Sequence, residues 1–389
     1  MIKRNILDCM TLVGGTPLRF EGEKTYVSTG AVDCDHVDYA QTERVTYDNR
    51  PSRANLSVAE GDILFAKMCG TKKTLRIDRP LSEHLYSTGF CAVRANESLI
   101  DAALLYHLLA SDQFLTQKDQ NSSGATQKAI TNAGLRKIVI QVPDLPEQRK
   151  LAANLDCIEQ MMANRREQLV SFDQLVKSRF IELFGDLASP DCKWETKKLV
   201  ETCVAADDIK CGPFGTQLSK DEYVDSGVAV WEIPQINSLF ATLPTHYLTE
   251  EKAKELDAYS IKAGDIAMSR KGNVGKCAVF PISFASGIIH SDVLRIRVDG
   301  SQVLPLFMMH QLHYSGSVQH QIELVSAGAI MAGINVTKLK QISVHIPPMR
   351  LQQQFVAFVE QTDKSKLAVQ KGLQELEILK KSLMQQYFG

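Results

Sequence analysis

The sequence lacks a long apolar run: no stretch approaches roughly eighteen consecutive apolar residues, so we expect no membrane span. It also lacks the apolar core and cleavage site of a signal peptide near its start, and we expect these first residues to belong to the folded protein. The nine cysteines include no C-x-x-C pair, which argues against disulfides and against zinc. A hydrophobic content of 44% in 389 residues then predicts two or three globular domains.

An excess of positive charge is also missing. The formal net charge of −1 weighs against DNA binding, because many DNA-binding proteins are strongly basic. Basic residues clustered in a few loops, or phosphate contacts supplied by partner subunits, would reconcile this charge with a role on DNA. Both explanations predict that the isolated chain binds DNA weakly.

Motifs for catalysis are missing as well. A DNA-adenine methyltransferase needs a glycine-rich S-adenosylmethionine loop and an Asn/Asp-Pro-Pro-aromatic motif, but Ile346–Met349 lacks both the amide and the aromatic side chain. A P-loop needs G-x-x-x-x-G-K-[ST], and Gly272–Cys277 has the wrong spacing and no hydroxyl after its lysine. Pro190-Asp191 followed by Glu195-Thr196-Lys197 resembles a nuclease PD…ExK motif, but the gap is too short for neighbouring strands. We therefore expect no active site.

Three histidines, His310, His313 and His320, fall on one expected helix, and the first two share a face. No acidic residue or cysteine stands at a suitable spacing for a metal ligand. We expect these side chains to lie on a satisfied helix surface and predict no metal site.

The chain repeats itself once. Leu135–Pro143 resembles Leu339–Pro347 at an offset of 204 positions (339 − 135). The same offset joins Gln148 to Gln352, Gly124 to Gly328, Ile130 to Ile334, and Phe184-Gly185 to Phe388-Gly389. Gly61-Asp62-Ile63 matches Gly264-Asp265-Ile266 at 203, and Gly15-Thr16 is a weaker match to Gly215-Thr216 at 200. An ordered series of matches whose offset drifts slowly indicates two homologous units with loop insertions.

Each copy begins with a mixture of strands and helix. The expected strands are apolar or alternating runs, namely Ile63–Ala66, Phe90–Val93, Ile138–Val142, Ile266–Met268, Val293–Val298 and Ile342–Ile346. A helical stretch precedes the last strand of each copy, at Ala102–Leu115 and Pro305–Val325. Prolines after the last strands end them and open the next element.

Each copy ends in a long helix of about 37 residues, roughly 55 Å. Its apolar residues follow a heptad spacing of four and three, at Leu151, Leu155, Ile158, Met162, Leu169, Phe172, Val176 and Leu183, and again at Phe355, Val359, Val369, Leu373, Leu376, Leu383 and Tyr387. Polar residues enter this seam at Arg165 and Arg179, and at Thr362, Lys366 and Lys380. The uninterrupted seam favours helices that pair with each other over helices that pack only on their own domains.

This order resembles that of the specificity (HsdS) subunits of type I restriction–modification systems, over essentially the whole chain. The resemblance rests on the doubled Gly-Asp-Ile strand start, the Ser/Gly-rich loop, the proline after the last strand, the Gln-containing helix start and the Phe-Gly end. It implies an α+β fold with two target-recognition domains separated by two long antiparallel coiled-coil helices, an internal pseudo-two-fold repeat. The expected segments are a first recognition domain at 1–145, a spacer helix at 146–185, a connector at 186–193, a second recognition domain at 194–348 and a spacer helix at 349–389.

The resemblance further implies that each domain reads one half of a bipartite, asymmetric DNA site, with the helices as a spacer. Implied partners are double-stranded DNA, two modification subunits that use S-adenosylmethionine and two restriction subunits that use ATP and magnesium, all in the cytoplasm. This chain would hold no cofactor and no catalytic residue. The modification subunits would dock on the helices and on the domains.

Glycine-permitted loops carrying Arg, Lys, Asn or Gln are the expected DNA contacts, because these side chains reach phosphates and base edges. Loop A follows the Gly-Asp-Ile strand and contributes Lys67, Thr71, Lys72 and Lys73, and Arg270, Lys271, Asn273 and Lys276. Loop B precedes the last strand and contributes Ser123, Thr126, Gln127 and Lys128, and Ser326 and Asn335. The glycine turn near the start of each copy is a weaker candidate, with Thr16 and Arg19, and Thr216 and Gln217. The alternative is that these segments are ordinary solvated turns.

Two other classes of function remain open. A coiled-coil scaffold would pair protein partners without touching DNA, and would make the basic loops incidental. A self-contained restriction–methylation enzyme would need several hundred more residues of catalytic domain than this chain has.

Overall fold

The computed structural model describes residues 2–125, 127–187, 189, 192–326 and 333–388. The chain divides into two compact units, Met1–Glu167 with Val369–Gly389, and Gln168–Ala368. Each unit therefore holds one mixed domain, called the first domain (residues 2–144) or the second domain (192–348), and part of each long helix. This division cuts both long helices, so the predicted domain boundaries remain predictions. Within the described residues, none of the helices has the length and hydropathy of a membrane span.

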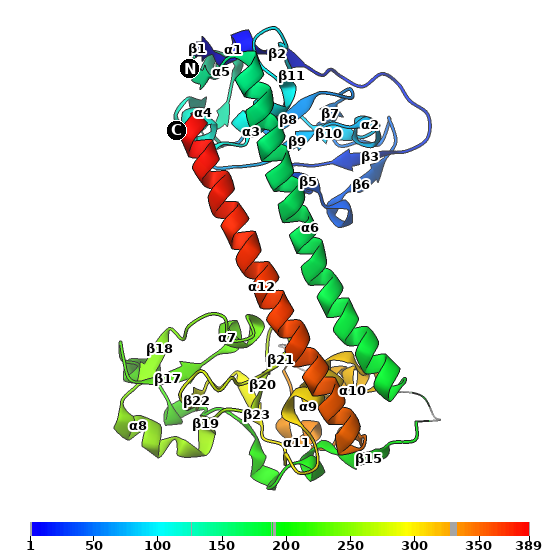
Figure 1. The fold of residues 1–389 in the computed structure, drawn as a ribbon, viewed down its shortest axis with the longest axis vertical. Helices are drawn as coiled ribbons and strands as arrows, with labels where there is room; N and C mark the ends of the chain where they lie inside the picture. The colour runs from blue at the N-terminus through cyan, green and yellow to red at the C-terminus, as the bar shows by residue number, and fades with distance from the viewer. Residues whose placement is uncertain (1, 126, 188, 190–191, 327–332, 389) are drawn as a thin grey trace. The chain divides into compact units, whose positions relative to one another are not determined.

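The first unit contains many short elements. They are β1 (Ile2–Asn5), α1 (Ile6–Cys9), β2 (Met10–Val13), β3 (Lys24–Val27), β4 (Val32–Asp33), β5 (His36–Val37), η1 (Tyr39–Gln41), β6 (Glu43–Val45), β7 (Ala54–Leu56), β8 (Ile63–Ala66), β9 (Thr74–Arg76), α2 (Arg79–Ser82), β10 (Leu85–Ser87), β11 (Phe90–Ala95), α3 (Ala102–Leu109), α4 (Asp112–Gln120), β12 (Ser122–Ser123), β13 (Ala129–Ile130), α5 (Asn132–Leu135) and β14 (Val139–Val142). The long helix α6 (Leu145–Phe184) begins in this unit (Figure 1).

The second unit repeats the arrangement. Its elements are β15 (Glu195–Lys198), η2 (Leu199–Thr202), η3 (Ala206–Asp208), β16 (Ile209–Cys211), η4 (Gly215–Gln217), η5 (Lys220–Glu222), β17 (Val228–Trp231), α7 (Ile233–Asn237), β18 (His246–Leu248), α8 (Glu250–Glu255), η6 (Asp257–Tyr259), β19 (Ser260–Ile261), β20 (Ile266–Ser269), β21 (Cys277–Val279), β22 (Gly287–Ile289), β23 (Val293–Ile296), α9 (Pro305–Tyr314), α10 (Gly316–Ser326), α11 (Val336–Leu339) and β24 (Ser343–Ile346). The long helix α12 (Met349–Phe388) begins in this unit.

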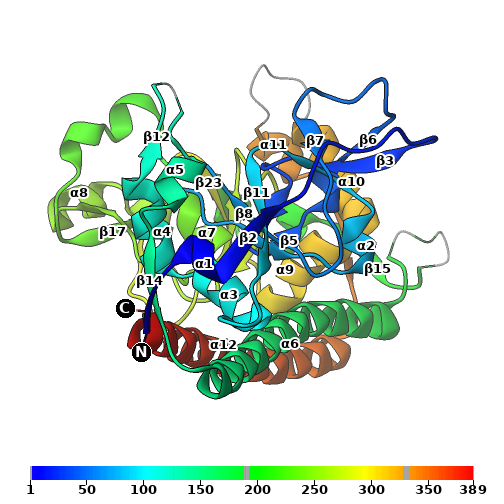
Figure 2. The same cartoon turned by 90° about the horizontal axis from the view of Figure 1, so that it is seen from above.

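The sheets of the two domains share one topology, which confirms the predicted internal repeat. An antiparallel sheet has the order β2-β11-β8-β9 in the first domain and β16-β23-β20-β21 in the second. A mixed sheet has the order β6-β3-β10-β7 or β18-β17-β22-β19, with one parallel pair in each. The opening strand of each domain pairs with its closing strand, β1 with β14 (which lies beside the blue N-terminal segment in Figure 2) and β15 with β24.

The central strands are buried on both faces, which explains why they are almost continuously apolar. In β8, Ile63 and Phe65 pack toward α3, α4 and the start of α6, whereas Leu64 and Ala66 pack toward the mixed sheet. This alternation follows from the two-residue period of a strand. The antiparallel sheet therefore lies between the helices and the mixed sheet, and each face has its own core.

The repeated Gly-Asp-Ile motif is a structural turn. Gly61 and Gly264 adopt φ of +87° and +88°, a left-handed conformation that favours glycine. The buried Asp62 carboxylate accepts hydrogen bonds from the Ala59 amide at 2.8 Å and from Arg94 Nε at 2.9 Å, and Asp265 is held in the same way. The motif thus fixes the strand that leads into loop A.

The helical stretches predicted at 102–115 and 305–325 are each broken into two helices, which corrects the prediction of one helix. The break falls at Ser111 in the first domain and at Ser315 in the second. Ala110 ends α3, and Ser111 caps the start of α4, because its hydroxyl accepts a hydrogen bond from the Phe114 amide at 3.1 Å. A local side-chain bond thus competes with continuation of the helix.

The long helices begin at a buried glutamine and end at an aromatic residue. Gln148 Nε2 donates to the carbonyls of Leu99 and Pro143, and its Oε1 accepts from the Asp101 amide. At the far end Gly185 has φ of +75°, the left-handed stop expected after a helix. Gly389, the equivalent predicted stop, lies outside the described residues.

Candidate nucleic-acid interface

Loop A (67–73) and loop B (122–130) of the first domain lie side by side, although they are about fifty residues apart in the sequence. A β-bridge joins Met68 to Ala129. The Cys69 amide donates to the Lys128 carbonyl at 2.9 Å. The structure thus brings together the two stronger candidate segments of this domain.

A third segment meets these loops, the turn between β10 and β11 (87–89), here called turn C. The Lys67 amide donates to the Gly89 carbonyl at 2.9 Å, and the Lys67 carbonyl accepts from the Ile130 amide at 2.9 Å. Lys67 therefore ties turn C on one side to loop B on the other.

The second domain uses the same backbone framework at offsets of 203 and 204. The Arg270 amide donates to the Asp292 carbonyl in turn C (290–292) at 2.9 Å, and the Arg270 carbonyl accepts from the Ile334 amide at 3.1 Å. Loop A (270–276) and the described part of loop B (326–335) are therefore joined as in the first domain. The duplicated convergence of three loops is the arrangement on which a common function would depend.

Three of the cations predicted to contact DNA form hydrogen bonds that hold the loops in place. Lys73 Nζ donates to the Thr29 carbonyl at 2.8 Å, and Lys276 Nζ donates to the Asn237 carbonyl at 2.9 Å. Arg270 donates to two backbone carbonyls, at 3.2 and 3.3 Å, and its guanidinium lies 4.7 Å from the Phe214 ring centre. These side chains are half-buried and shape the loops.

The remaining candidates differ in exposure. The exposed ones are Thr16, Arg19, Lys72, Ser123, Gln127, Lys128, Gln217, Asn273 and Asn335, and the other half-buried ones are Lys67, Thr71, Lys271 and Ser326. Thr126 and the side chain of Thr216 lie outside the described residues. All these assignments to DNA binding remain predictions.

Two exposed or half-exposed lysines are paired with carboxylates. Lys72 Nζ lies 2.8 Å from Asp112 and lowers the pKa of that carboxyl through a hydrogen bond. Lys271 Nζ lies 2.9 Å from Asp292. A phosphate would compete with these carboxylates for the ammonium groups, which would weaken binding by the isolated domains.

The glycine turns behave differently in the two domains. In the first domain Thr16 and Arg19 are exposed, and Arg19 pairs with Asp48 at 3.5 Å on a surface where both side chains are more than three-quarters exposed. In the second domain Phe214 brings the turn against Arg270 of loop A. Only the second glycine turn is therefore seen to join the other loops within the described residues.

Sequence reasoning missed turn C. Its signal was present, because Gly89 and the polar run His290–Asp292 stand between two apolar strand segments. The pairing of the turn with loop A depends on strand order in the sheets, which the sequence does not display.

Every predicted seam residue of the long helices is buried or half-buried. Near the domains the seam packs into the domain cores, as Leu151 and Leu155 do in the first unit and Val176, Phe355 and Val359 in the second. The seam therefore serves helix pairing and domain packing in different stretches.

Two of the polar seam positions, Lys366 and Lys380, form ion pairs between the helices. In the first unit Lys380 of α12 pairs with Glu159 of α6 at 2.6 Å, and in the second unit Lys366 of α12 pairs with Asp173 of α6. In the first unit Arg166 also lies 3.7 Å from Glu377. Within each unit the α6 and α12 segments run antiparallel, because residues later in α6 face residues earlier in α12, which confirms the predicted orientation.

An aromatic cluster that the seam did not predict anchors the helices in the second unit. It includes Phe180, Phe184, Phe307 and Phe355, with ring centres 4.8–6.5 Å apart. Phe388, at the repeat position of Phe184, is 1% exposed and lies in the core of the first unit. The Phe-Gly ends thus bury their aromatic rings in the domains.

The sequence predicted that the three histidines lie on a helix surface with their polar atoms satisfied, and this prediction is wrong for His310. This side chain is buried and stacks on Tyr314, with ring centres 5.3 Å apart. Neither ring nitrogen has a hydrogen-bond partner among the described residues. Burial lowers the pKa of His310 to about 3, with a smaller contribution from His313, so the ring is neutral at neutral pH. The helix carrying it faces the aromatic cluster.

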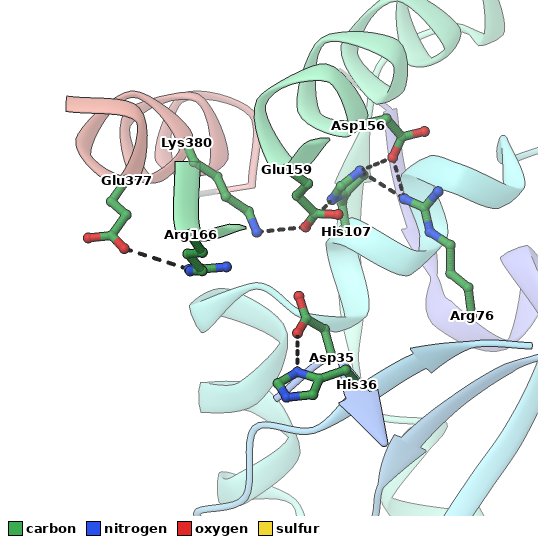
Figure 3. Close-up of polar contacts among 9 residues, drawn as sticks. All are labelled: Asp35, His36, Arg76, His107, Asp156, Glu159, Arg166, Glu377 and Lys380. Carbon is green, nitrogen blue, oxygen red and sulfur yellow. Dashed lines mark hydrogen bonds and ion pairs between the residues drawn. The ribbon is translucent and has the colours of Figure 1, made fainter. Parts of the chain in front are cut away.

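Figure 3 shows an ion network in the first unit, around His107, the repeat position of His310. His107 Nε2 lies 2.8 Å from Asp156 and 3.0 Å from Arg76 Nη2, and Arg76 also pairs with Asp156. His107 Nδ1 lies 3.5 Å from Glu159, which pairs with Lys380. Burial lowers the pKa of His107, and burial would raise the pKa of Asp156, but hydrogen bonds from Arg76 and His107 lower it.

This network has the donor atoms of a metal site, because one atom each of His107, Asp156 and Glu159 lie within 4.8 Å of one another. However, the Arg76 guanidinium and the Lys380 ammonium already neutralise the two carboxylates. A divalent cation would have to displace both. The arrangement therefore fits an ion network that joins β9, α3, α6 and α12.

The PD…ExK resemblance cannot be placed in full, because Pro190 and Asp191 lie outside the described residues. Glu195 stands in β15 and forms an ion pair with Lys197 at 3.7 Å.

Comparison with known proteins gives a consistent result. The profile of the type I restriction modification DNA specificity domain matches residues 15–170 and 193–378. The specificity subunit of the type I restriction enzyme StySPI of Salmonella potsdam is 21% identical over 315 residues, covering 78% of this chain and 68% of the relative. That of EcoKI of Escherichia coli (strain K12) is 22% identical over 319 residues, with the same coverage.

Solved structures share the fold. A chain from a study of complex assembly and conformational transition in a type I restriction–modification system is 20% identical, with a TM-score of 0.60 over 100% of this chain and 97% of that chain. The S subunit of such a system from M. genitalium is 15% identical, with a TM-score of 0.58 over 100% and 96% of the two chains. The predicted fold class is confirmed.

Proposed function

This chain belongs to the type I restriction modification DNA specificity family, and we propose that it is the specificity subunit of a type I restriction–modification complex. Each domain reads one half of a bipartite, asymmetric DNA site, and α6 and α12 set the spacing between the halves. The observation that best supports this proposal is that loop A, turn C and loop B meet in both domains through equivalent backbone hydrogen bonds. Because the side chains on these two frameworks differ, the two half-sites should differ as well.

Two modification subunits are the proposed partners on the helices. Large apolar side chains outside the seam support this part, since a solvated helix surface has little need of them. The exposed ones are Met161, Ile378 and Leu379 in the first unit and Val170, Leu175, Ile181 and Leu367 in the second. S-adenosylmethionine would bind to the modification subunits, and ATP with magnesium to two restriction subunits, in the cytoplasm where the DNA is.

The chain itself is proposed to be non-catalytic. Incubation of the purified chain with DNA and radioactive S-adenosylmethionine should give no methyl transfer, whereas addition of the modification subunit should restore it. Methyl transfer by the chain alone would favour a self-contained enzyme.

The proposal is tested directly by sequencing the methylated DNA of a host that expresses this chain with its modification partner. We expect one split, non-palindromic motif methylated on adenine. A palindromic motif, or no motif beyond that of a host with the modification subunit alone, would overturn the proposal.

A second experiment separates DNA reading from a scaffold role. Lys72→Ala with Lys128→Ala in the first domain should weaken binding of the assembled complex to DNA and reduce the slope of log K against log salt by roughly one per lost phosphate contact. Lys254→Ala, at an exposed lysine of α8, is the matched control. A complex that assembles and binds DNA equally well with the double variant and with the control would instead favour the scaffold.

A further inference from the structure

Lys118 is a lysine with a fully buried ammonium beside loop A. Its side chain, in α4, is 1% exposed. Its Nζ donates to the carbonyls of Met68 and Thr71 at 2.8 Å and of Ala66 at 3.2 Å. An ammonium has three N–H donors, so three carbonyls satisfy it completely.

The neighbouring residue, Asp119, binds an amide of the same loop, whereas Lys118 binds its carbonyls. Asp119 Oδ2 accepts a hydrogen bond from the Gly70 amide at 3.0 Å. Lys118 and Asp119 therefore bind carbonyl and amide groups of one short loop from the last turn of α4. The chain continues directly from α4 into loop B, so this turn is placed to set both loops together.

The buried charge is costly, which argues against a role in packing alone. Lysine is almost never fully buried, and burial lowers the pKa of Lys118, with Asp119 acting in the opposite sense. The only carboxylate recorded near its ammonium, within the described residues, is Asp119 at 3.7 Å. An apolar side chain would fill the site without this desolvation penalty, but would leave three loop carbonyls without a donor.

The second domain shows the contrast. The position equivalent to Lys118 is Ile322, which packs at Gly275 of loop A. There Arg270, the first residue of loop A, donates to the carbonyls of Ile334 in loop B and Ser291 in turn C. Both domains thus place a cation on backbone carbonyls at this point, but Lys118 reaches loop A from α4, whereas Arg270 reaches out from loop A itself.

We propose that Lys118 is a positioning residue for sequence reading by the first domain: its ammonium fixes the backbone of loop A in the form that meets one half of the DNA site. This inference rests on the proposed function, in which loops A and B contact DNA.

The test uses the full chain in complex with its modification subunits, on unmethylated duplexes that carry the motif which the complex methylates. Lys118→Ile installs the residue of the second domain, and Lys118→Met keeps an unbranched side chain without the charge. Asp119→Ala removes the acceptor for Gly70 together with the carboxylate beside the Lys118 ammonium, and Lys137→Met changes an exposed lysine as the control. Methylation rates are compared for the intact motif, for motifs altered in the first half and for motifs altered in the second half.

We expect both Lys118 variants to lower discrimination against altered first halves by about tenfold or more, the size of one lost base-reading contact, with discrimination in the second half unchanged. Asp119→Ala should act in the same direction and less strongly. Wild-type discrimination in both halves, equal loss in both halves, or failure of the Lys118 variants to assemble would each overturn the inference.

The loop variant with Lys72→Ala and Lys128→Ala distinguishes failure of the positioning inference from failure of the proposed function. If that variant loses the first half-site while Lys118→Met retains it, the positioning inference fails and the proposed function stands. If the loop variant and both Lys118 variants all read the first half normally, the assignment of loops A and B to DNA fails as well.

Discussion

Gln352 begins α12 with a buried amide that holds three backbone groups of the second unit. Its Oε1 accepts from the Leu304 amide at 2.8 Å, and its Nε2 donates to the carbonyls of Pro347 at 2.8 Å and Gln302 at 3.2 Å. The side chain is 0% exposed. The perturbation is Gln352→Met, which keeps the length of the side chain but can neither donate nor accept these bonds.

The expected cost follows from the groups left behind. A buried polar group without a partner costs about 1–3 kcal/mol, and some of the three will find other partners, so we expect a loss of about 2–5 kcal/mol in the free energy of unfolding of the second unit. For a unit of this size, that corresponds to a fall of roughly 5–15 °C in the unfolding midpoint. Gln353→Met, at the next and exposed position, should change the stability by less than about 0.5 kcal/mol.

The assay combines urea unfolding followed by circular dichroism with hydrogen exchange of single amides. Exchange at the Leu304 amide should accelerate strongly in Gln352→Met, because its acceptor is gone, and should stay unchanged in Gln353→Met. Equal stability of the two variants, or unchanged protection at Leu304, would refute the reasoning that these bonds hold the helix start on the domain.

Two further predictions concern single rings in the cores. The pKa of His310 is lowered to about 3 by burial, and its charged or titratable neighbours are His313, Lys366 and Asp173. Below pH 6.5 this histidine is therefore protonated in the unfolded chain but still neutral in the folded chain. Stability should therefore fall between pH 6.5 and 4 by up to about 1.4 kcal/mol per unit, and urea unfolding of His310→Phe should show a shallower fall. An unchanged slope would contradict this. Phe388→Ala should cost the first unit about 3–5 kcal/mol in urea unfolding despite its place near the chain end, and a cost below 1 kcal/mol would show that its burial is unimportant.

The repeat and the helix seam could be predicted from the sequence because they depend on local periodicity. The heptad spacing from Leu151 to Leu183 records which face of the helix is apolar. The Gly-Asp-Ile matches record a turn whose left-handed glycine and buried carboxylate are needed wherever the fold recurs. Such features leave a signal within a few residues of themselves.

The errors have a different origin. His310 looked like a surface residue because its helix was judged alone, whereas Phe355 of α12 packs against its ring. The helix breaks were missed because one serine hydroxyl, as at Ser111, outweighs several good helix formers. Turn C was missed because its partner in loop A is more than twenty residues away.

The sequence by itself determined the doubled architecture, three strands of each copy and the two long helices, because apolar periodicity and turn chemistry are written along the chain. Only the tertiary structure decided that loop A, turn C and loop B meet. It also decided that the side chains of Lys73, Lys118 and Arg270 donate to backbone carbonyls, while Lys128 stays exposed. The reason is physical: a side chain's hydrogen-bond partners depend on which distant strands are neighbours in a sheet, and residue type alone carries no record of that.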